Sequence, residues 1–305
     1  MRPLLVPVPA GFDFERTVRS HGWYDLPPFS WDAAQRRLGR VFLLSSRRPV
    51  GTTVRATRRG LAVSPEAGTD LPENERAELA RQVRSCFRLD EDLDAFHRAA
   101  RRYPEFRWIA AAGAGRMLRA PTVFEDVIRM ICTTNCSWSL TVVMITNLVE
   151  AFGAISPAGA VAFPAPAALA ATTESLLRKE IRTGYRSPYL LELASHAASG
   201  RLDVEAWRTS TRSTTELYEE LCGVKGIGPY AAGNLLKLLG RYEHLGLDSW
   251  VRARYAELHA RGRKVSDRTI ERRYRRYGEW RGLFFWLEMT RSWHERKFRR
   301  AEEEA

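Results

Sequence analysis

The stretch LCGVKGIGPYAAGNLLKLLG, residues 221–240, decides the fold, and LGLDSWVRARYAEL, residues 245–258, follows it closely. The first stretch is predicted to form a helix, a tight Gly-Ile-Gly turn and a second helix that begins just after Gly228. The glycines at positions 226 and 228 permit positive φ angles and a close approach of the backbone to a ligand. Pro229 fits the first turn of the second helix, where its missing N–H is not needed.

This turn has two interpretations. The amide groups at the start of the second helix lack partners within the helix, and such helix starts bind phosphate groups. Lys225 immediately precedes the turn and adds a positive charge on the same side. The alternative is an ordinary connection between two helices, which glycine-rich sequences often form. The turn alone does not distinguish these two roles.

The composition favours a polyanionic partner. The chain of 305 residues has a formal net charge of +12 and a pI near 9.9, which is typical of proteins that bind nucleic acid. Nearly all of the positive charge is arginine, whose planar fork suits phosphate geometry. The apolar fraction of 45% allows a proper core, and the length indicates two domains or one large one.

The four cysteines do not indicate a metal centre. Cys132 and Cys136 could share a helix face, but no further ligand follows at the spacing of zinc or iron–sulfur sites. So few cysteines in a chain of this length do not suggest disulfides, so we expect reduced thiols and a cytosolic protein. The N-terminus does not resemble a signal peptide and no apolar run could span a membrane, so no membrane association is expected.

The pattern of the chain changes near residue 100. Before it, short β-branched or apolar segments predict an antiparallel sheet, and after it helical patterns dominate. The predicted strands lie within residues 2–9, 39–48, 51–60 and 61–68. The predicted helices lie within residues 71–89, 90–103, 122–153, 162–180, 187–203 and 271–300. We therefore expect a mainly α member of the α+β class, with a sheet-containing domain at 1–100 and a helical domain at 101–305.

The sequence resembles the helix–hairpin–helix (HhH-GPD) superfamily of DNA glycosylases, in particular the 8-oxoguanine and 3-methyladenine glycosylases. VKGIGPYAAGNLL (224–236) is similar to their hairpin, and Asp248 matches the aspartate that follows it. FEDVIRMICTTNCSW (124–138) is similar to the segment that carries an asparagine contacting the orphan base. LLRKEIRTGYRSPYL (176–190) is similar to the segment with a wedge tyrosine and an adjacent arginine. The likeness covers most of residues 10–290.

The resemblance implies a role for each matching residue. Asp248 would stabilise positive charge on the sugar while the N-glycosidic bond breaks, and it would also cap the helix at 249–258. Tyr185 would fill the gap left by a flipped base, and Arg186 and Asn135 would contact the orphaned partner base. On residue type alone, the segment around Tyr185 would be interpreted as a loop whose tyrosine and arginine merely pack and solvate. The residues that would hold DNA phosphate are Gly226, Gly228 and Lys225.

Position 230 departs from the family pattern. Glycosylases that also nick the strand carry a lysine after the hairpin that forms a Schiff base with the sugar, and this sequence has Tyr230 there. Lys225 precedes the turn and Lys237 lies about 10 Å further along the helix, so neither is expected to reach the sugar. We therefore expect a monofunctional enzyme that uses water as the nucleophile. Tyr230 would line the base pocket or pack as an ordinary core tyrosine.

The expected function is excision of an alkylated or oxidised purine from double-stranded DNA by a monomer. No metal ion, iron–sulfur cluster or organic cofactor is expected. Such an enzyme would lie in the cytoplasm at the nucleoid of a bacterium, or in the nucleus of a eukaryote. The alternatives are a bifunctional glycosylase/AP lyase and a non-catalytic protein that binds damaged DNA or a DNA structure.

Two aromatic features have structural explanations. RRYRRYGEW (272–280) interleaves arginines with aromatic residues, a pattern typical of nucleic-acid contact. We expect instead a solvated helix face with Tyr274 and Tyr277 packed inward and only a general electrostatic contribution. Trp138 is expected beside the core rather than in a base pocket.

Overall fold

The computed structural model describes residues 3–303, with side chains up to His294, and divides into two compact units. Unit 1 comprises the chain up to Glu91, Arg116–Ser210 and Val224–Gly226. Unit 2 comprises Asp92–Gly115, Thr211–Gly223 and the chain from Ile227 onward. The two units interleave along the sequence, and the division expected at residue 100 stays a prediction.

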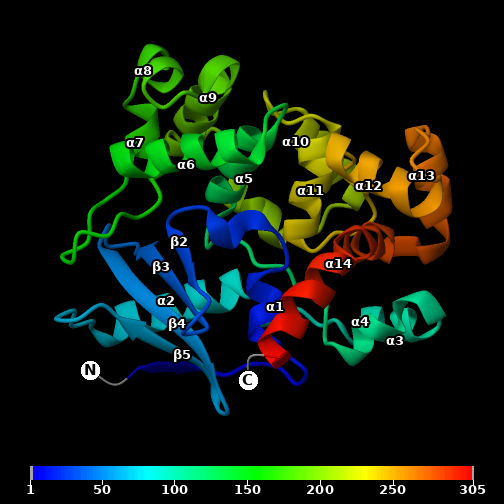
Figure 1. The fold of residues 1–305 in the computed structure, drawn as a ribbon. Coiled ribbons are helices and arrows are strands. Elements are labelled where there is room, and N and C mark those ends of the chain that lie inside the picture. Colours follow the sequence, from blue (N-terminus) through cyan, green and yellow to red (C-terminus); the bar gives the residue numbers. More distant parts are fainter. Residues whose placement is uncertain (1–2, 304–305) are drawn as a thin grey trace. The chain divides into compact units, whose positions relative to one another are not determined.

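Unit 1 contains an antiparallel sheet with the strand order β1-β5-β4-β3-β2, which confirms the predicted sheet (Figure 1). Its strands are β1 (Leu4–Val6), β2 (Phe29–Asp32), β3 (Arg37–Leu43), β4 (Pro49–Thr57) and β5 (Gly60–Pro65). The sequence pattern missed β2, which is short, half polar and preceded by two prolines. Proline before a strand suits an edge position, and β2 is the edge strand beside β3.

Helices surround this sheet within unit 1. Glu78 of α2 accepts hydrogen bonds from Ser45, and the amide of Gln82 donates to the carbonyl oxygen of Leu43 at the end of β3, so α2 packs on the sheet. The helices of this unit are α1 (Phe14–Val18), α2 (Glu73–Cys86), α5 (Val123–Thr133), α6 (Trp138–Phe152), α7 (Pro166–Ala170), α8 (Glu174–Lys179) and α9 (Ser187–Ala198). Short 3-10 turns lie at η1 (Gly22–Asp25), η3 (Gly184–Arg186) and η4 (Val204–Thr209).

The helical run predicted over 122–153 is two helices, α5 and α6, with a break between them. Asn135 has a left-handed backbone with φ +47°, which a continuous helix cannot include. Ser137 then caps α6, because its hydroxyl accepts from the amide of Leu140 at 3.3 Å. The predicted end at Gly153 is confirmed.

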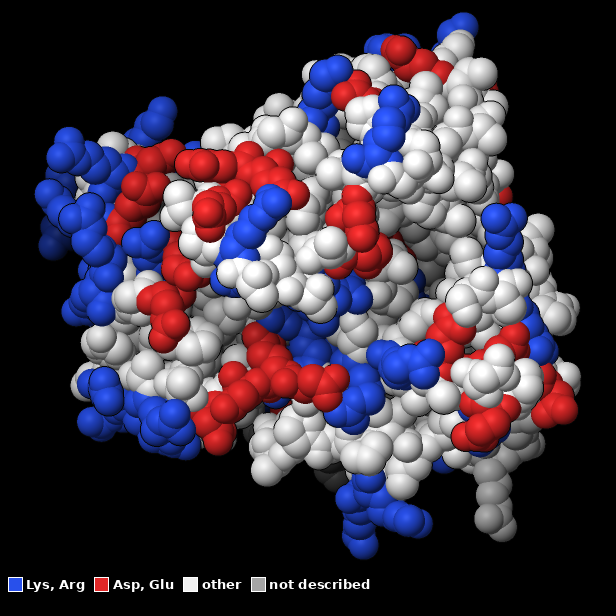
Figure 2. Space-filling model, turned by 180° about the vertical axis from the view of Figure 1, so that it is seen from behind, with Lys and Arg blue, Asp and Glu red and all other residues white. Residues whose placement is uncertain are grey.

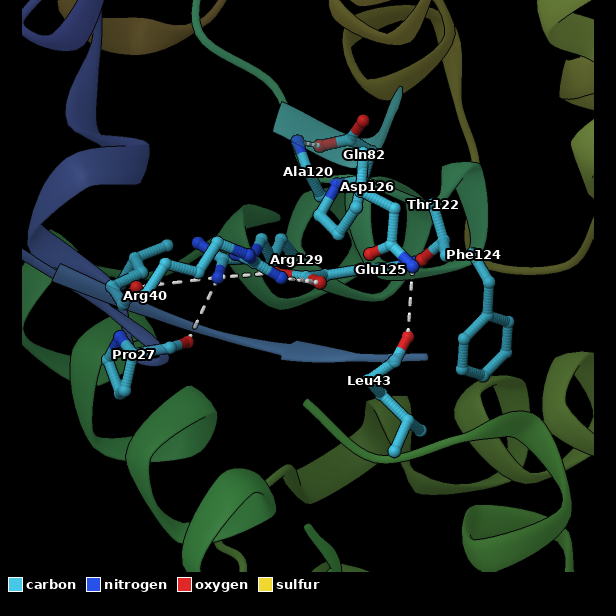
Figure 3. Close-up of polar contacts among 12 residues, drawn as sticks. Pro27, Arg40, Leu43, Gln82, Ala120, Thr122, Phe124, Glu125, Asp126 and Arg129 are labelled. Atoms are coloured by element: carbon cyan, nitrogen blue, oxygen red, sulfur yellow. Dashed lines mark hydrogen bonds and ion pairs between the residues drawn. The ribbon is translucent and has the colours of Figure 1, made fainter. Parts of the chain in front are cut away.

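A buried ionic cluster joins α5 to the sheet (Figure 3). The guanidinium of Arg40 on β3 donates two hydrogen bonds to Glu125 on α5, at 3.1 and 2.6 Å. Arg129, one turn further along α5, donates to the same carboxylate at 2.6 Å and to the carbonyl oxygen of Pro27 at 2.9 Å. All three charged side chains are at most 2% exposed, so their mutual pairing offsets the cost of removing them from water.

Among the residues described, unit 2 contains helices joined by loops and no strand. Its helices are α3 (Asp94–Arg101), α4 (Arg107–Ala111), α10 (Thr214–Cys222), α11 (Pro229–Leu239), α12 (Ser249–His259), α13 (Asp267–Tyr274) and α14 (Arg281–Glu303), with 3-10 turns η2 (Pro104–Phe106) and η5 (Arg275–Trp280). Tyr274 and Tyr277 are buried, which confirms that they pack inward. The rings of Phe96, Tyr103 and Phe106 pack on Phe284 with centroids 4.8–5.8 Å apart and form an aromatic core. In the part of the chain described, no helix has the length and apolar character needed to cross a membrane.

Candidate functional site

The turn between α10 and α11 uses its two glycines differently. Gly226 has φ +89°, and a Cβ there would lie 3.0 Å from the ring of Tyr189. Gly228 has φ −95°, which any residue can adopt, and no heavy atom lies within 4 Å of the position of its Cβ. The fold therefore requires glycine at position 226. At position 228 the fold would accept a side chain, so a glycine there is needed only if a ligand occupies the space.

Helix α11 begins next to that space. Gly228 is its N-cap residue and supplies no side-chain hydrogen bond, and Pro229 occupies the first turn as predicted. Lys225 is exposed, and its ammonium pairs with Glu192 at 2.7 Å. A surface pair of this kind is weak, so Lys225 remains able to exchange the carboxylate for a phosphate.

Asp248 is the N-cap of α12, which confirms the predicted capping role. Its Oδ1 accepts a hydrogen bond from the amide of Val251 at 2.8 Å. The side chain is half-buried, and the hydrogen bonds of the described residues leave Oδ2 available for another partner. The cap thus fixes Oδ1, and Oδ2 stays available to contact another group.

The segment before Asp248 is attached to α11 by two polar side chains whose contacts the sequence analysis did not predict. Asn234 donates to the carbonyl oxygen of Gly246 at 3.2 Å and to that of Tyr230 at 2.9 Å. Lys237 donates to the carbonyl oxygen of Leu245 at 2.7 Å. Leu245 and Gly246 lie beyond the end of α11, so the helical pattern does not signal these two contacts.

Lys237 is fully buried, although its side chain ends in an amine that is normally charged. Burial lowers the pKa of Lys237 to about 7, against the opposing effect of the negative charge of Asp248. Tyr230, at the position where a strand-nicking enzyme would carry lysine, is half-buried in the first turn of α11. Neither Lys225 nor Lys237 occupies the position of Tyr230 in the first turn of α11.

A tryptophan cluster lies two residues beyond Asp248. The ring of Trp250 is 39% exposed, and its centroid lies 5.0 Å from that of Trp293 and 6.3 Å from that of Trp286. Trp286 and Trp293 are seven residues apart on α14, so they share one helix face. That spacing was the signal in the sequence that could have revealed this cluster.

In unit 1, the structure brings together Asn135, Tyr185 and Arg186. The hydroxyl oxygen of Tyr185 lies 3.3 Å from the amide nitrogen of Asn135, and the guanidinium of Arg186 lies over the tyrosine ring, 4.5 Å from its centroid. Tyr185 is 46% exposed. The left-handed, exposed Asn135 presents its side chain from the break between α5 and α6.

Arg186 is buried, whereas a residue that contacts a base would be expected to be exposed. It is 4% exposed, and its guanidinium donates to the carbonyl oxygen and the hydroxyl of Thr134 and to the carbonyl oxygen of Thr183. Contact with a base would require some of these donors to change partner.

The prediction for Trp138 is wrong, because this residue is 41% exposed instead of lying beside the core. Its ring rests against Gly22, where a Cβ would come within 2.5 Å of it.

The predicted site residues thus fall into two sets. Unit 1 contains Asn135, Tyr185, Arg186, Lys225 and Gly226, and unit 2 contains Gly228, Tyr230 and Asp248. Lysine and arginine side chains are interspersed with acidic ones on the face shown in Figure 2. Among the described residues, no group of three or more His, Cys, Asp or Glu side chains could hold a metal ion.

Comparison with known proteins establishes the fold. No protein-family model matches the sequence, and no curated protein matches it significantly. A 3-methyladenine DNA glycosylase from Archaeoglobus fulgidus matches the structure with a TM-score of 0.71 at 18% identity, over 95% of this chain and 97% of that one. An 8-oxoguanine glycosylase/lyase from Clostridium acetobutylicum matches with a TM-score of 0.71 at 19% identity, over 95% and 99%. MBOgg1, solved with a low-affinity DNA ligand, matches with a TM-score of 0.70 at 21% identity, over 95% and 94%.

Proposed function

We propose that this protein is a DNA glycosylase that excises a damaged purine, with Asp248 as its catalytic carboxylate. The observation that carries the proposal is the geometry of Asp248, whose Oδ1 is held by the start of α12 while Oδ2 is presented. The shared fold supports it, because the similar structures include a 3-methyladenine glycosylase and an 8-oxoguanine glycosylase/lyase. The net charge of +12 supports a DNA substrate.

The reaction begins with extrusion of the damaged nucleotide, because the glycosidic bond is inaccessible inside the duplex. The N-terminus of α11 and the open space at Gly228 suit a DNA phosphate. Exposed Tyr185 is suited to stack in the vacated position, with Asn135 beside it. Arg186 would assist by exchanging one of its bonds to Thr134 for the orphaned base.

Bond cleavage gives the sugar oxocarbenium character. A fixed carboxylate near the developing cation stabilises it without having to reorganise, which is the source of its catalytic advantage. Asp248 meets that requirement because its cap bond restricts the side chain. The tryptophans beside it, Trp250, Trp286 and Trp293, offer aromatic surface for an extruded base.

We expect excision without strand cleavage, because the described residues near Asp248 offer no suitable amine. Tyr230 cannot form an imine, Lys237 is buried and bound to the carbonyl oxygen of Leu245, and Lys225 precedes the turn, on its proposed phosphate side. Water is then the nucleophile and an abasic site is the product. Borohydride added during turnover should trap no protein–DNA adduct. An adduct at catalytic yield would show that a lysine attacks the sugar.

The function is tested by incubation with duplexes that carry 3-methyladenine, 8-oxoguanine, hypoxanthine or uracil. At least one damaged purine should be released, and Asp248→Asn should lower the single-turnover rate by more than about a hundredfold, close to 3 kcal/mol of transition-state stabilisation. Binding of the same duplex should change little, because phosphate contacts carry the affinity. Tight binding with no release of any base would identify a non-catalytic DNA-binding protein instead.

A further inference from the structure

Lys237 makes contacts that connect α11 to the segment that carries Asp248. Its side chain is fully buried, and its Nζ donates to the carbonyl oxygen of Leu245 at 2.7 Å and to Oδ1 of Asn234 at 3.1 Å. A third, longer bond of 3.4 Å reaches the carbonyl oxygen of Gly233. The amide of Asn234 completes the connection by donating to Gly246. Two consecutive backbone carbonyls are therefore held from one face of α11.

The segment lies directly on these side chains. Gly246 has φ +63°, and a Cβ there would lie 2.6 Å from the amide nitrogen of Asn234 and 2.9 Å from Nζ of Lys237. The backbones also meet, since a Cβ on Gly233 would lie 2.9 Å from Cα of Gly246. Because residues 233 and 246 are both glycines, the backbone of the segment can lie against the backbone of α11. The segment therefore has no room to move closer to α11.

We propose that Lys237 is a positioning residue, whose ammonium fixes the segment Leu245–Leu247 on α11 and thereby sets the position of Asp248. The inference rests on the proposed glycosylase activity, because it assigns Lys237 to the same reaction. Lys237 acts through the backbone that leads into the helix cap, and it has no covalent role.

The proton on Lys237 matters for this role. A protonated amine offers three N–H donors, which matches the three oxygens around Nζ. A neutral amine offers two and turns a lone pair toward the third oxygen, so the attachment weakens on deprotonation. Burial already lowers the pKa of Lys237 to about 7. Excision should therefore slow as the pH rises above that value.

The charged groups around Lys237 do not reverse this direction. Asp248, at the start of α12, favours the protonated amine. His244 lies on the connecting segment, and its pKa is lowered by burial and by Arg281 of α14, while Glu243 opposes that effect. His244 is consequently neutral above pH 7, where Lys237 loses its proton, and its own titration falls at lower pH.

The test compares wild type, Lys237→Met and Lys264→Met in single-turnover excision from pH 6 to 9. Methionine approximates the length of lysine without a donor, and Lys264 is an exposed lysine of the same unit that serves as the control. Lys237→Met should lower the rate at pH 6 by about tenfold or more, leave the duplex Kd within about twofold, and abolish the decline at high pH. Lys264→Met should match wild type in all three respects.

A measurement that does not depend on excision accompanies this test. The chain contains five lysines, so lysine labelled with ¹³C at Cε gives a spectrum that single substitutions can assign. One resonance should titrate near pH 7 and be absent from Lys237→Met. Asn234→Leu removes the amide that holds Gly246 and also one of the three oxygens around Nζ, so it should slow excision and reduce the pH decline.

These outcomes separate the two proposals. If wild type excises a base but Lys237→Met retains both its rate and its pH profile, Lys237 has no positioning role. A wild-type rate that rises above pH 7 would also overturn the inference. If wild type releases no base from any duplex, the proposed function fails, while the Cε titration still reports the protonation of Lys237.

Discussion

Lys237 illustrates how one residue can affect stability and activity in opposite directions. Its folded-state pKa of about 7 lies below the value of about 10.4 expected in an unfolded chain. Between these two values the unfolded chain binds the extra proton, so the free energy of unfolding rises with pH. Below pH 7 the amine is charged in both states and the pH dependence from this group vanishes.

This linkage gives a prediction for Lys237→Met. The free energy of unfolding of wild type minus that of the variant should rise by about 1.4 kcal/mol per pH unit between pH 7.5 and 9.5. Urea denaturation of both proteins at several pH values measures the difference, and groups shared by both proteins cancel in it. A difference that is constant with pH would mean that the amine is not buried as the structure has it.

At the scale of single elements, the turn before α11 offers a matched pair of substitutions. Gly228→Val should weaken the binding of lesion-free and lesion-bearing duplex alike by about tenfold, because the space it fills is open in the protein and faces the proposed phosphate. Its thermal stability should change little, since its φ of −95° suits any residue.

Gly226→Val is the partner substitution for this comparison. It should lower stability as well as binding, because Gly226 has φ +89° and its Cβ would approach Tyr189. Fluorescence anisotropy with labelled duplex and thermal melts distinguish the two variants. Unchanged affinity in a folded Gly228→Val protein would make the turn a purely structural connection.

The attachment of α5 to the sheet gives a second prediction at this scale. Glu125→Ala should lower the free energy of unfolding by about 3–5 kcal/mol, because Arg40 and Arg129 would then be buried without their carboxylate. Glu174→Ala removes an i,i+4 partner of Arg178 on the surface and should cost less than about 1 kcal/mol. Equal losses in the two variants, measured by urea denaturation, would contradict the importance of the buried pairing.

Local sequence signals predicted the elements that depend on local chemistry. Asp248 was recognised as a cap and Pro229 as the first residue of a helix, because both roles depend on neighbouring residues. The break at Asn135 was missed, since apolar spacing continues on both sides of it and only the backbone reveals the left-handed residue. The edge strand β2 was missed because its residues alternate too briefly to signal a strand.

The candidate site was predictable to the extent that it resembles a known family. That resemblance located Tyr185, Arg186 and Asn135, which the structure brings together. It did not reveal that Arg186 is buried, because its guanidinium is bound by Thr134, which lies 52 residues earlier in the chain. Lys237 was placed correctly along its helix, but its contact with Leu245 requires the folded segment that precedes Asp248.

At the scale of the whole molecule, the charge of +12 predicts binding that depends strongly on salt. If about four phosphates are neutralised, raising the salt concentration from 50 to 200 mM should weaken duplex binding about a hundredfold. Lesion-bearing and lesion-free duplexes should give the same slope of log Kd against log salt, because the backbone is common to both. A slope near zero for both duplexes would show that phosphate contacts do not carry the affinity.

The interleaving of the two units also constrains how the chain acquires its structure during synthesis on the ribosome. The ring of Phe96 packs on Trp280 and Phe284, which the ribosome adds long after Phe96 itself. The segment Asp92–Gly115 must therefore wait, with its aromatic side chains uncovered, until α14 has emerged. A chain whose translation stops before α14 would leave those side chains exposed and prone to aggregation or to capture by chaperones.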